Sequence, residues 1–342
     1  MSEIKYIVKV EIKELWNSKS LNIEWNLDPD VNVLAGDNGS GKSTILDLIA
    51  GVFVNNYSHD TGRKAKSVKI TFNDGKIASF ENIKGSIAML ETRAKSNERI
   101  KKFLSKLKKQ EGKNYSKIAA IEFAEFSYEQ LGVEPIKLTE MLETISTFDQ
   151  ELKDLETLKK FSDNLRTELD WQLYLLQQKY YNYTSSTGTL AVEALLNENN
   201  ENKEQVDDLK RQVTIQKAKQ NLFFGIIDSL FSNTGKKINR KNSDLSFLKE
   251  DKIQVQFHQL SSGEKQILII LLSALIQADK PFIMIMDEPE ISLHTDWQED
   301  LITNIRKLNE NVQIIIATHS PFIIAHGWVN KVFQVNKITT PN

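Results

Sequence analysis

The chain contains no cysteine among its 342 residues. This absence excludes disulfide bonds, cysteine-bound zinc and catalysis by a thiolate. A chain without cysteine also suits a reducing compartment. The chemistry of the protein must therefore be carried by oxygen and nitrogen side chains and by the backbone.

Long apolar runs and an excess of one charge are missing as well. The longest apolar stretches, such as 267–276, are too short to span a bilayer, and residues 1–10 lack the apolar core of a signal peptide. Lysine and arginine number 44 against 46 aspartate and glutamate, a net charge of −2, so no global field draws the chain to nucleic acid or membrane. We expect a cytoplasmic protein with no membrane contact.

The most informative feature present is a glycine loop near the start of the chain. Residues Gly36 to Ser43 match G-x-x-x-x-G-K-S, after a short apolar run that predicts a buried strand and before an amphipathic stretch that predicts a helix. In such a loop, backbone N–H groups converge on phosphate oxygens, the lysine reaches the β- and γ-phosphates, and the serine hydroxyl ligates Mg²⁺. The predicted ATP contacts are Gly36, Asn38, Gly39, Gly41, Lys42, Ser43 and Thr44.

Two acidic residues follow a second apolar run, 282–286, near the end of the chain. Ligands bind at the carboxyl ends of strands in open parallel sheets. Asp287 is predicted to hold Mg²⁺, directly or through water, and Glu288 to orient and deprotonate the attacking water. The plainer alternative is a pair of acidic residues that cap a helix.

Two further signals lie on either side of this acidic pair. His319 follows the apolar run 312–317 and is predicted to contact the γ-phosphate and report on its presence. Residues Leu260 to Glu264 open a predicted helix, at which Ser261 and the Gly263 backbone could bind a γ-phosphate. A serine followed three residues later by a glutamate is also a capping box, so this motif has a purely structural alternative.

The order of the predicted elements indicates an α/β fold whose ATPase core is split by a helical insertion. Strand and helix patterns alternate in the first and last parts, which implies a parallel sheet, and an opening antiparallel pair and a hairpin at Asn73–Gly75 make the sheet mixed. Leucines between 152 and 176 recur at spacings of three and four, which predicts a long helix interrupted at 180–188 and followed by a returning helix from about Val206. We predict three parts: residues 1–85 and 251–342 as the core, and 86–250 as a mostly helical lobe with a helical hairpin.

These motifs resemble those of the ABC-type ATPase superfamily of P-loop proteins. Lys42 and Ser43 match its Walker A motif, Leu260 to Glu264 its signature, Asp287 and Glu288 its Walker B motif, and His319 its switch histidine. In that superfamily, the signature of one subunit covers ATP held on the Walker A loop of another. The resemblance implies a homodimer with sandwiched ATP and Mg²⁺, with a higher oligomer left open.

Within the superfamily, three segments resemble the soluble branch: Asp287 to His294, the following Trp297-Gln298, and Thr318 to Pro321. That branch includes overcoming-lysogenisation-defect nucleases, RecF- and SMC-like repair ATPases, and the ATPase subunits of anti-phage systems such as Septu and PARIS. His294 stands where transporters usually have an aspartate, which argues against a transporter subunit. Because few residues follow His319, we expect no nuclease domain of the kind found in the first group. The resemblance implies an ATP-dependent switch for a separately encoded nuclease or toxin in phage defence; the alternative is a DNA-binding repair or recombination ATPase.

The sequence leaves alternatives for the function of several charged and aromatic segments. The basic stretch 99–109, the clusters Lys236–Lys237 and Arg240–Lys241, and the tyrosines at 180–183 could contact nucleic acid, although solvated faces and an aromatic core are the plainer interpretations. Arg63 could reach a phosphate, as an arginine of this region does in some soluble relatives, although a solvated loop is the plainer interpretation. The Q-loop glutamine of the superfamily cannot be chosen among Gln110, Gln130 and Gln178.

Overall fold

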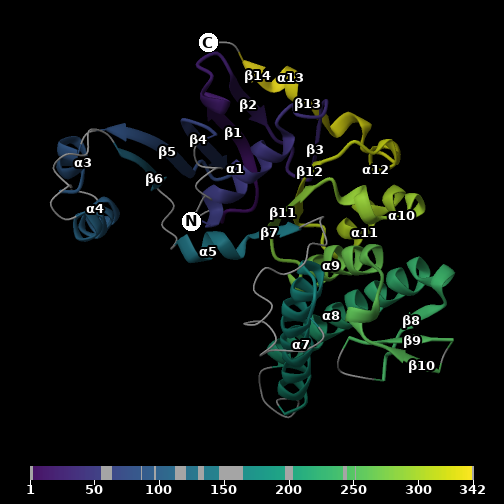
Figure 1. The fold of residues 1–342 in the computed structure, drawn as a ribbon. Coiled ribbons are helices and arrows are strands. Elements are labelled where there is room, and N and C mark those ends of the chain that lie inside the picture. Colours follow the sequence, from purple (N-terminus) through teal and green to yellow (C-terminus); the bar gives the residue numbers. More distant parts are fainter. Residues whose placement is uncertain are drawn as a thin grey trace. The chain divides into compact units, whose positions relative to one another are not determined.

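The computed structural model describes residues 3–54, 64–85, 87–95, 98–111, 121–129, 135–145, 165–196, 203–241, 245–250 and 252–340. The chain divides into two compact units (Figure 1). Unit 1 comprises residues 1–29, 36–142 and 333–342, and unit 2 comprises residues 30–35 and 143–332. The fold is α/β, as the sequence predicts, whereas the three-part division at residues 85 and 250 remains a prediction.

Unit 1 is built on an antiparallel sheet with the strand order β14-β2-β1-β4-β5-β6. The strands are β1 (Ile7–Lys13), β2 (Asn22–Asn26), β4 (Ser67–Phe72), β5 (Ile77–Gly85), β6 (Ile121–Glu129) and β14 (Thr339–Thr340). Strand β1 pairs with β2 and with β4, and β4 pairs with β5 across the turn at Asn73–Gly75. The predicted opening pair and hairpin are therefore confirmed.

The helices of unit 1 are α1 (Lys42–Val54), α3 (Ile87–Arg93), α4 (Glu98–Glu111), α5 (Pro135–Glu140) and α13 (Val335–Ile338), with a 3-10 turn η1 at Leu15–Asn17. Helix α1 buries an apolar face, as its spacing predicts, and Phe53 on that face meets Phe72 of β4 edge to face. Helices α3 and α4 pack through Leu90, Ile100 and Leu104.

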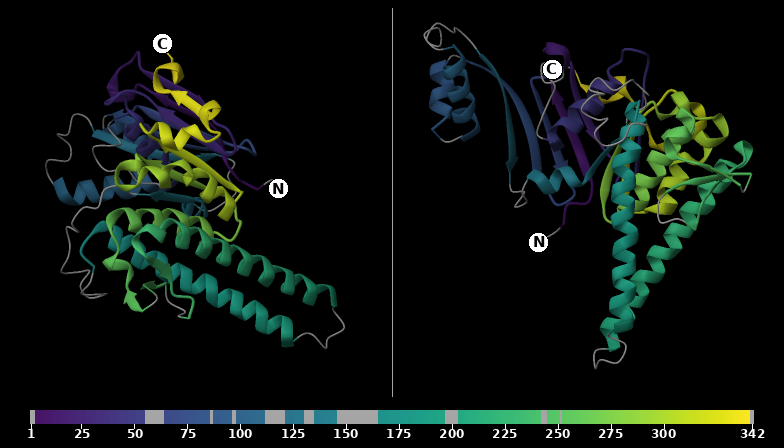
Figure 2. Two further views of the ribbon diagram at one scale, coloured as in Figure 1. Left: turned by 90° about the vertical axis from the view of Figure 1, so that its right-hand side faces the viewer. Right: turned by 60° about the horizontal axis from the view of Figure 1, so that its bottom comes forward.

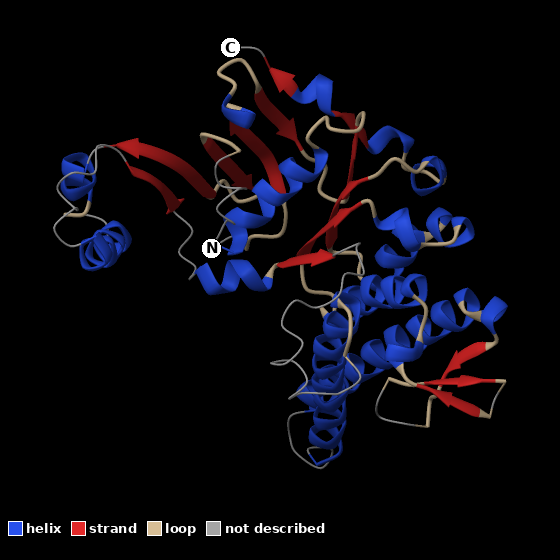
Figure 3. Cartoon of the chain, viewed as in Figure 1, coloured by secondary structure: helices blue, strands red, loops and turns tan. Residues whose placement is uncertain are grey.

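One strand of unit 1 is an exception within the stretch that the sequence predicts to be mostly helical from residue 86 onward. Strand β6 pairs with β5 in antiparallel register from Ile77↔Glu129 to Gly85↔Ile121, and Figure 3 shows the two as a long ribbon. The segment 121–129 carries aromatic and β-branched residues in quick succession, which favours a strand. Its partner lies about 40 residues earlier in the chain, so local pattern alone did not reveal the pairing.

Unit 2 contains the parallel strands β3 (Val31–Ala35), β12 (Val312–Ala317) and β11 (Phe282–Asp287), in that order. Their residues are almost all buried, which explains the continuous apolar runs in the sequence. The parallel sheet is thus confirmed. The five-strand order is completed by β13 (Val332–Gln334) and β7 (Leu142–Ile145), the two strands within which the chain passes from one unit to the other.

Helix α9 (Ser262–Ile276) occupies the centre of unit 2, and every residue from Gly263 to Leu275 is buried. A buried ion pair of 2.8 Å between Lys265 and Asp170 ties it to the start of α7. The helix predicted over 295–308 is two helices, α10 (Thr295–Glu299) and α11 (Leu301–Leu308), because Asp300 leaves the helical conformation. The short elements η5 (Pro289–Ser292), α12 (Pro321–Ala325) and η6 (Val329–Lys331) complete this part.

The helical hairpin consists of α7 (Glu168–Leu196) and α8 (Lys203–Leu230), which lie side by side as an antiparallel pair (Figure 2). The predicted interruption at 180–188 is wrong, since α7 continues through it. Tyr180 and Tyr183 are buried, Gln220 donates to the Tyr180 hydroxyl, and the Tyr183 hydroxyl donates to the Gln216 carbonyl. These two rings are core residues, not a stacking platform. The predicted leucines from 152 to 158 lie outside the described residues.

A small antiparallel sheet follows the hairpin. Strands β8 (Lys236–Ile238), β9 (Phe247–Lys249) and β10 (Ile253–Val255) have the order β10-β9-β8, with 3-10 turns η3 (Ser232–Thr234) and η4 (Phe257–Gln259) on either side. Phe231 contacts both Phe247 and Trp297, with ring centroids 5.6 and 5.9 Å away. Among the described helices of both units, none combines the length and the apolar character needed to cross a membrane.

Candidate functional site

The glycine loop begins at Gly36, the residue after β3, and ends where α1 starts at Lys42. The Lys42 side chain is 5% exposed, and its Nζ donates to the carbonyl oxygens of Gly36 at 2.9 Å and Asp37 at 3.2 Å. The Ser40 N–H donates to the Asp37 carbonyl, which closes a tight turn. The loop therefore curls around the lysine ammonium, as a phosphate-binding loop requires.

Gly41 combines a positive φ with a close side-chain neighbour, so a substitution at this loop position is strained. Its φ is +100°, in the region that L side chains rarely adopt, and a Cβ there would lie 2.8 Å from the ring of Trp16. Trp16 itself has a positive φ of 55° and is half exposed beside the loop. The turn at Leu15–Asn17 thus presses an aromatic ring against the last glycine of the loop.

The first turn of α1 presents polar groups to solvent. Asn38 and Gly39 in the loop and Ser43 in the helix are exposed, and Thr44 is half-buried. Backbone N–H groups at a helix N-terminus, together with the helix dipole, attract anions. The loop residues that the sequence predicts as ATP contacts therefore lie where a phosphate could reach them.

In unit 2, a predicted metal ligand and a predicted catalytic residue lie at the carboxyl edge of the parallel strands. Asp287 is the last residue of β11, and its Oδ1 is buried without a hydrogen-bond partner. Glu288 has a left-handed φ of 47°, and its N–H donates to the Ala317 carbonyl of β12 at 2.7 Å. Such strain concentrates at functional sites, and the unpartnered carboxylate oxygen matches the oxygen ligands that Mg²⁺ takes.

Glu288 and His319, each predicted separately from the sequence, lie side by side. The His319 Nε2 is 3.6 Å from the Glu288 Oε1, and the two side chains are 40% and 31% exposed. The pairing arises because β11 and β12 are parallel neighbours with Asp287 opposite Ala317. A carboxylate and an imidazole at one strand edge can together position a water and transfer its proton.

The sequence prediction missed Glu290, which holds the loop that carries His319. Its Oε1 accepts from the Thr318 hydroxyl at 2.6 Å, from the His319 N–H at 2.8 Å and from the Ser320 N–H at 3.2 Å. The side chain therefore joins the turn after β11 to the turn after β12. Its position two residues after Glu288 is the only sequence signal that could have singled it out.

Gln298 is a second residue that the prediction missed. Its Nε2 donates to the Leu293 carbonyl at 2.8 Å, and its Oε1 accepts from the Ser320 hydroxyl at 2.6 Å. The Ser320 hydroxyl also caps the short helix α12 by accepting from the Phe322 N–H. Helix α10 is thereby bonded to the segment that carries His319.

The predicted signature opens α9 and forms the capping box that was its structural alternative. The Ser261 hydroxyl accepts from the Glu264 N–H, and the Glu264 carboxylate accepts from the Ser261 N–H at 2.9 Å. Gly263 lies against the Ser292 carbonyl, so closely that a Cβ at this position would overlap it. The motif is therefore structurally fixed at both residues predicted to bind phosphate.

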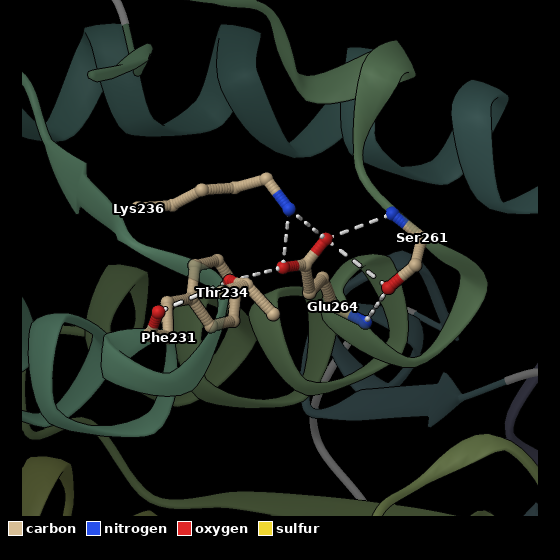
Figure 4. A network of polar contacts seen from close by, with 5 residues as sticks. All are labelled: Phe231, Thr234, Lys236, Ser261 and Glu264. Carbon is tan, nitrogen blue, oxygen red and sulfur yellow. Dashed lines mark hydrogen bonds and ion pairs between the residues drawn. The ribbon is translucent and has the colours of Figure 1, made fainter. Parts of the chain in front are cut away.

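The Glu264 carboxylate is buried in a network drawn in Figure 4. Lys236 Nζ lies 2.7 Å from its Oε1 and 3.0 Å from its Oε2, and the Thr234 hydroxyl donates to Oε1 at 2.8 Å. Burial alone would raise the pKa of this carboxyl, but the bonds from Lys236, from the Ser261 N–H and from Thr234 outweigh burial and lower the pKa below its usual value.

Some of the basic residues that were candidates for nucleic-acid contact are instead paired within the protein. Lys236 pairs with Glu264, and Arg240 pairs with Asp228 at 2.8 Å and lies over the Phe224 ring. On α4 the lysines at 101, 102, 106, 108 and 109 are exposed. Gln178 is exposed on α7, whereas Arg63, Gln130 and the Gln110 side chain lie outside the described residues.

No cluster of three or more histidine, aspartate or glutamate side chains suitable for a metal occurs in the described parts of the chain. Mg²⁺ usually keeps several waters and takes one or two carboxylates together with substrate phosphates. A lone Asp287 oxygen is compatible with that mode of binding. A metal held wholly by protein ligands finds no support in these residues.

The glycine loop before α1 and the acidic pair after β11 are the marks of a P-loop ATPase domain. The predicted single mixed sheet is instead an antiparallel sheet in unit 1 and a separate sheet with parallel strands in unit 2, with a helical hairpin inserted in the chain. A model of the family described as "AAA domain, putative AbiEii toxin, Type IV TA system" matches residues 31–325, and the chain belongs to this family.

Two curated relatives and one solved structure are similar along most of the chain. The Retron Ec83 probable ATPase of Escherichia coli is 22% identical, over 92% of this chain and 68% of the relative. The Retron Vc95 probable ATPase of Vibrio cholerae serotype O1 biovar El Tor is 23% identical, over 91% and 70%. A crystal structure of an Smc head bound to the C-winged helix domain of ScpA superposes with a TM-score of 0.50 at 16% identity, over 94% of this chain and 92% of that one. The last comparison identifies the fold as that of an SMC-type head.

Proposed function

We propose that this protein binds ATP with Mg²⁺ and hydrolyses it to ADP and phosphate. Lys42 and the N–H groups of residues 36–44 in unit 1 would hold the phosphates. Ser43 of unit 1 and Asp287 of unit 2 would each be a ligand of the metal, which would supply positive charge to neutralise the phosphoryl group. Glu288 accepts a proton from the attacking water, whose oxygen bonds to the γ-phosphorus while the bond to the ADP oxygen breaks. His319 contacts the γ-phosphate beside it.

The contact between Glu288 and His319 carries this proposal. Glu288 keeps a strained backbone, its carboxylate is accessible, and the imidazole is 3.6 Å away. A helix-capping role for the acidic pair has no support, because the Glu288 side chain makes no capping hydrogen bond to η5.

We further propose a head-to-tail pair in which Ser261 and Gly263 of one copy cover ATP held by the other.

Lys42→Ala is expected to weaken ATP binding by at least about 100-fold, because it removes the cation that meets the β- and γ-phosphates. Isothermal titration with ATP and Mg²⁺ measures this affinity. The matched control is Lys69→Ala in the same unit, an exposed lysine of β4 that lies 3.6 Å from Glu11. Thermal unfolding must first show that Lys42→Ala is folded. If the folded variant then binds ATP with wild-type affinity, Lys42 does not hold the phosphates.

We also propose that the ATPase is a switch for a separately encoded effector, a nuclease or toxin, in phage defence. Both relatives are named as the probable ATPase of a retron, which supports a role as one component among others. The test is to express the chain with its genetic neighbours, purify it through a tag and identify what is retained with and without ATP. A neighbour retained in an ATP-dependent manner is the expected result. A chain that retains none, with no effector gene beside it, contradicts the switch role but not the ATPase.

The exposed lysines of α4 favour a second candidate, a DNA-binding repair ATPase. A row of lysines on one helix face can neutralise phosphates, and the affinity then falls steeply with salt. Salt-dependent DNA binding that stimulates ATP turnover would support this candidate. ATP turnover that is indifferent to DNA counts against it.

A further inference from the structure

The Glu264 carboxylate lies beside the hydroxyl that the proposed function assigns to phosphate binding. Glu264 is 1% exposed. Its Oε2 is 3.1 Å from the Ser261 Oγ and accepts from the Ser261 N–H at 2.9 Å. Both Ser261 donors are thus directed at a carboxylate within the first turn of α9 (Figure 4).

An ionised carboxylate at this position opposes the arrival of another anion. The N-terminus of α9 attracts a phosphate through its N–H groups and dipole, but a negative charge three residues away cancels much of that attraction. Low exposure makes the repulsion stronger, because water screens buried charges poorly. If the signature is to receive a γ-phosphate, a positively charged group must therefore lie beside the Glu264 carboxylate and balance its charge.

Lys236 supplies that charge. Its ammonium contacts both carboxylate oxygens, at 2.7 and 3.0 Å, and its side chain is 16% exposed. The lysine lies at the first position of β8, directly after α8 and the turn at 231–235. Phe231 anchors this turn against Phe247 and Trp297, so the end of the helical hairpin fixes the position of the ammonium.

We propose that Lys236 is a positioning residue for the signature. By balancing Glu264, it lets the N-terminus of α9 receive the γ-phosphate of ATP bound to a second copy of the chain. The proposal rests on the proposed function, which supplies the second copy, and adds the residue that makes the signature able to receive an anion. It also connects the hairpin to nucleotide-dependent pairing, because displacement of β8 would withdraw the ammonium.

The experiment compares ATP-dependent pairing of charge variants, all in a Glu288→Gln background that prevents turnover. Lys236→Met should raise the dimer dissociation constant at saturating ATP by about tenfold or more, with ATP affinity of the single chain within about twofold of the parent. Lys236→Met/Glu264→Gln should restore pairing, because both charges are removed. Lys236→Arg should keep pairing, and Lys237→Met, on an exposed neighbour, should have no effect. Analytical ultracentrifugation measures pairing and titration calorimetry measures binding.

The rescue separates charge balance from a merely structural ion pair. A structural pair predicts that Lys236→Met/Glu264→Gln pairs no better than Lys236→Met, and that result overturns the proposal, as does normal pairing of Lys236→Met. If Lys236→Met does not fold, pairing of the folded double variant supports the proposal and its failure to pair overturns it. Failure of the parent itself to pair on ATP rejects the proposed sandwich, and this inference with it.

Discussion

Replacing Glu288 by glutamine is expected to lower the rate of ATP hydrolysis by roughly 10²–10⁴-fold, the range typical of a lost general base. Glutamine keeps the size and the hydrogen-bonding ability of the side chain but cannot accept the proton of the water. The left-handed φ of 47° is equally strained for either residue. ATP binding should therefore persist, and the nucleotide-bound pair should accumulate.

The chain offers a matched control for this variant. Glu299 lies with its Oε2 3.8 Å from the His326 Nε2, and its side chain is 40% exposed, so it forms a second glutamate–histidine contact in the same unit. Glu299→Gln should hydrolyse ATP at the wild-type rate. Steady-state phosphate release under saturating ATP compares the two variants. Turnover of Glu288→Gln within about tenfold of the wild type would show that another group takes the proton.

The parts of the site that local sequence specifies were predictable. Loop Gly36–Ser43 needs a strand before it and a helix after it, and Asp287 needs a buried strand that ends at it; both follow from short apolar runs and glycine positions. The helical hairpin was predicted because apolar residues recur with helical spacing. The interruption at 180–188 was wrong because a single exposed Gly188 costs a helix only about 1 kcal/mol, and the buried Tyr180 and Tyr183 pack on α8.

The parts that depend on pairing between distant segments were not predictable. Glu290 bonds to residues 28 to 30 positions later, and Lys236 pairs with a glutamate 28 positions later. Glu290 lies within the stretch Asp287 to His294 and Lys236 within a basic cluster, but neither position reveals a bonding partner, since a charged side chain in a sequence is usually solvated. Their roles become visible only once β12 lies beside β11 and β8 lies beside the start of α9. Strand β6 was missed for the same reason: its pairing partner β5 lies earlier in the chain, and helices α3 and α4 lie between the two strands in the sequence.

Removal of the Glu290 carboxylate is the second change with a large expected effect. Oε1 accepts three hydrogen bonds from the segment Thr318–Ser320, and bonds to an ionised acceptor are roughly twice as strong as neutral ones. Alanine leaves the Thr318 hydroxyl, which is buried, and the His319 N–H without this acceptor. The segment then loses the three bonds that tie it to the turn after β11, although Gln298 still holds Ser320.

Glu290→Ala is expected to lower kcat by about 100-fold, with the affinity for ATP within about threefold of the wild type, because no phosphate contact in the loop 36–44 is changed. Glu290→Gln keeps an oxygen acceptor, so its kcat should lie between those of the wild type and Glu290→Ala. Hydrogen exchange at the amides of His319 and Ser320 should accelerate in Glu290→Ala and much less in Glu290→Gln, since the exchange rate reports the lost bonds. Glu299→Ala controls for removal of a glutamate from the same unit. If kcat of Glu290→Ala falls while the amide exchange rates stay unchanged, Glu290 acts directly at the reacting atoms. If exchange accelerates while kcat stays unchanged, hydrolysis does not depend on how His319 is held.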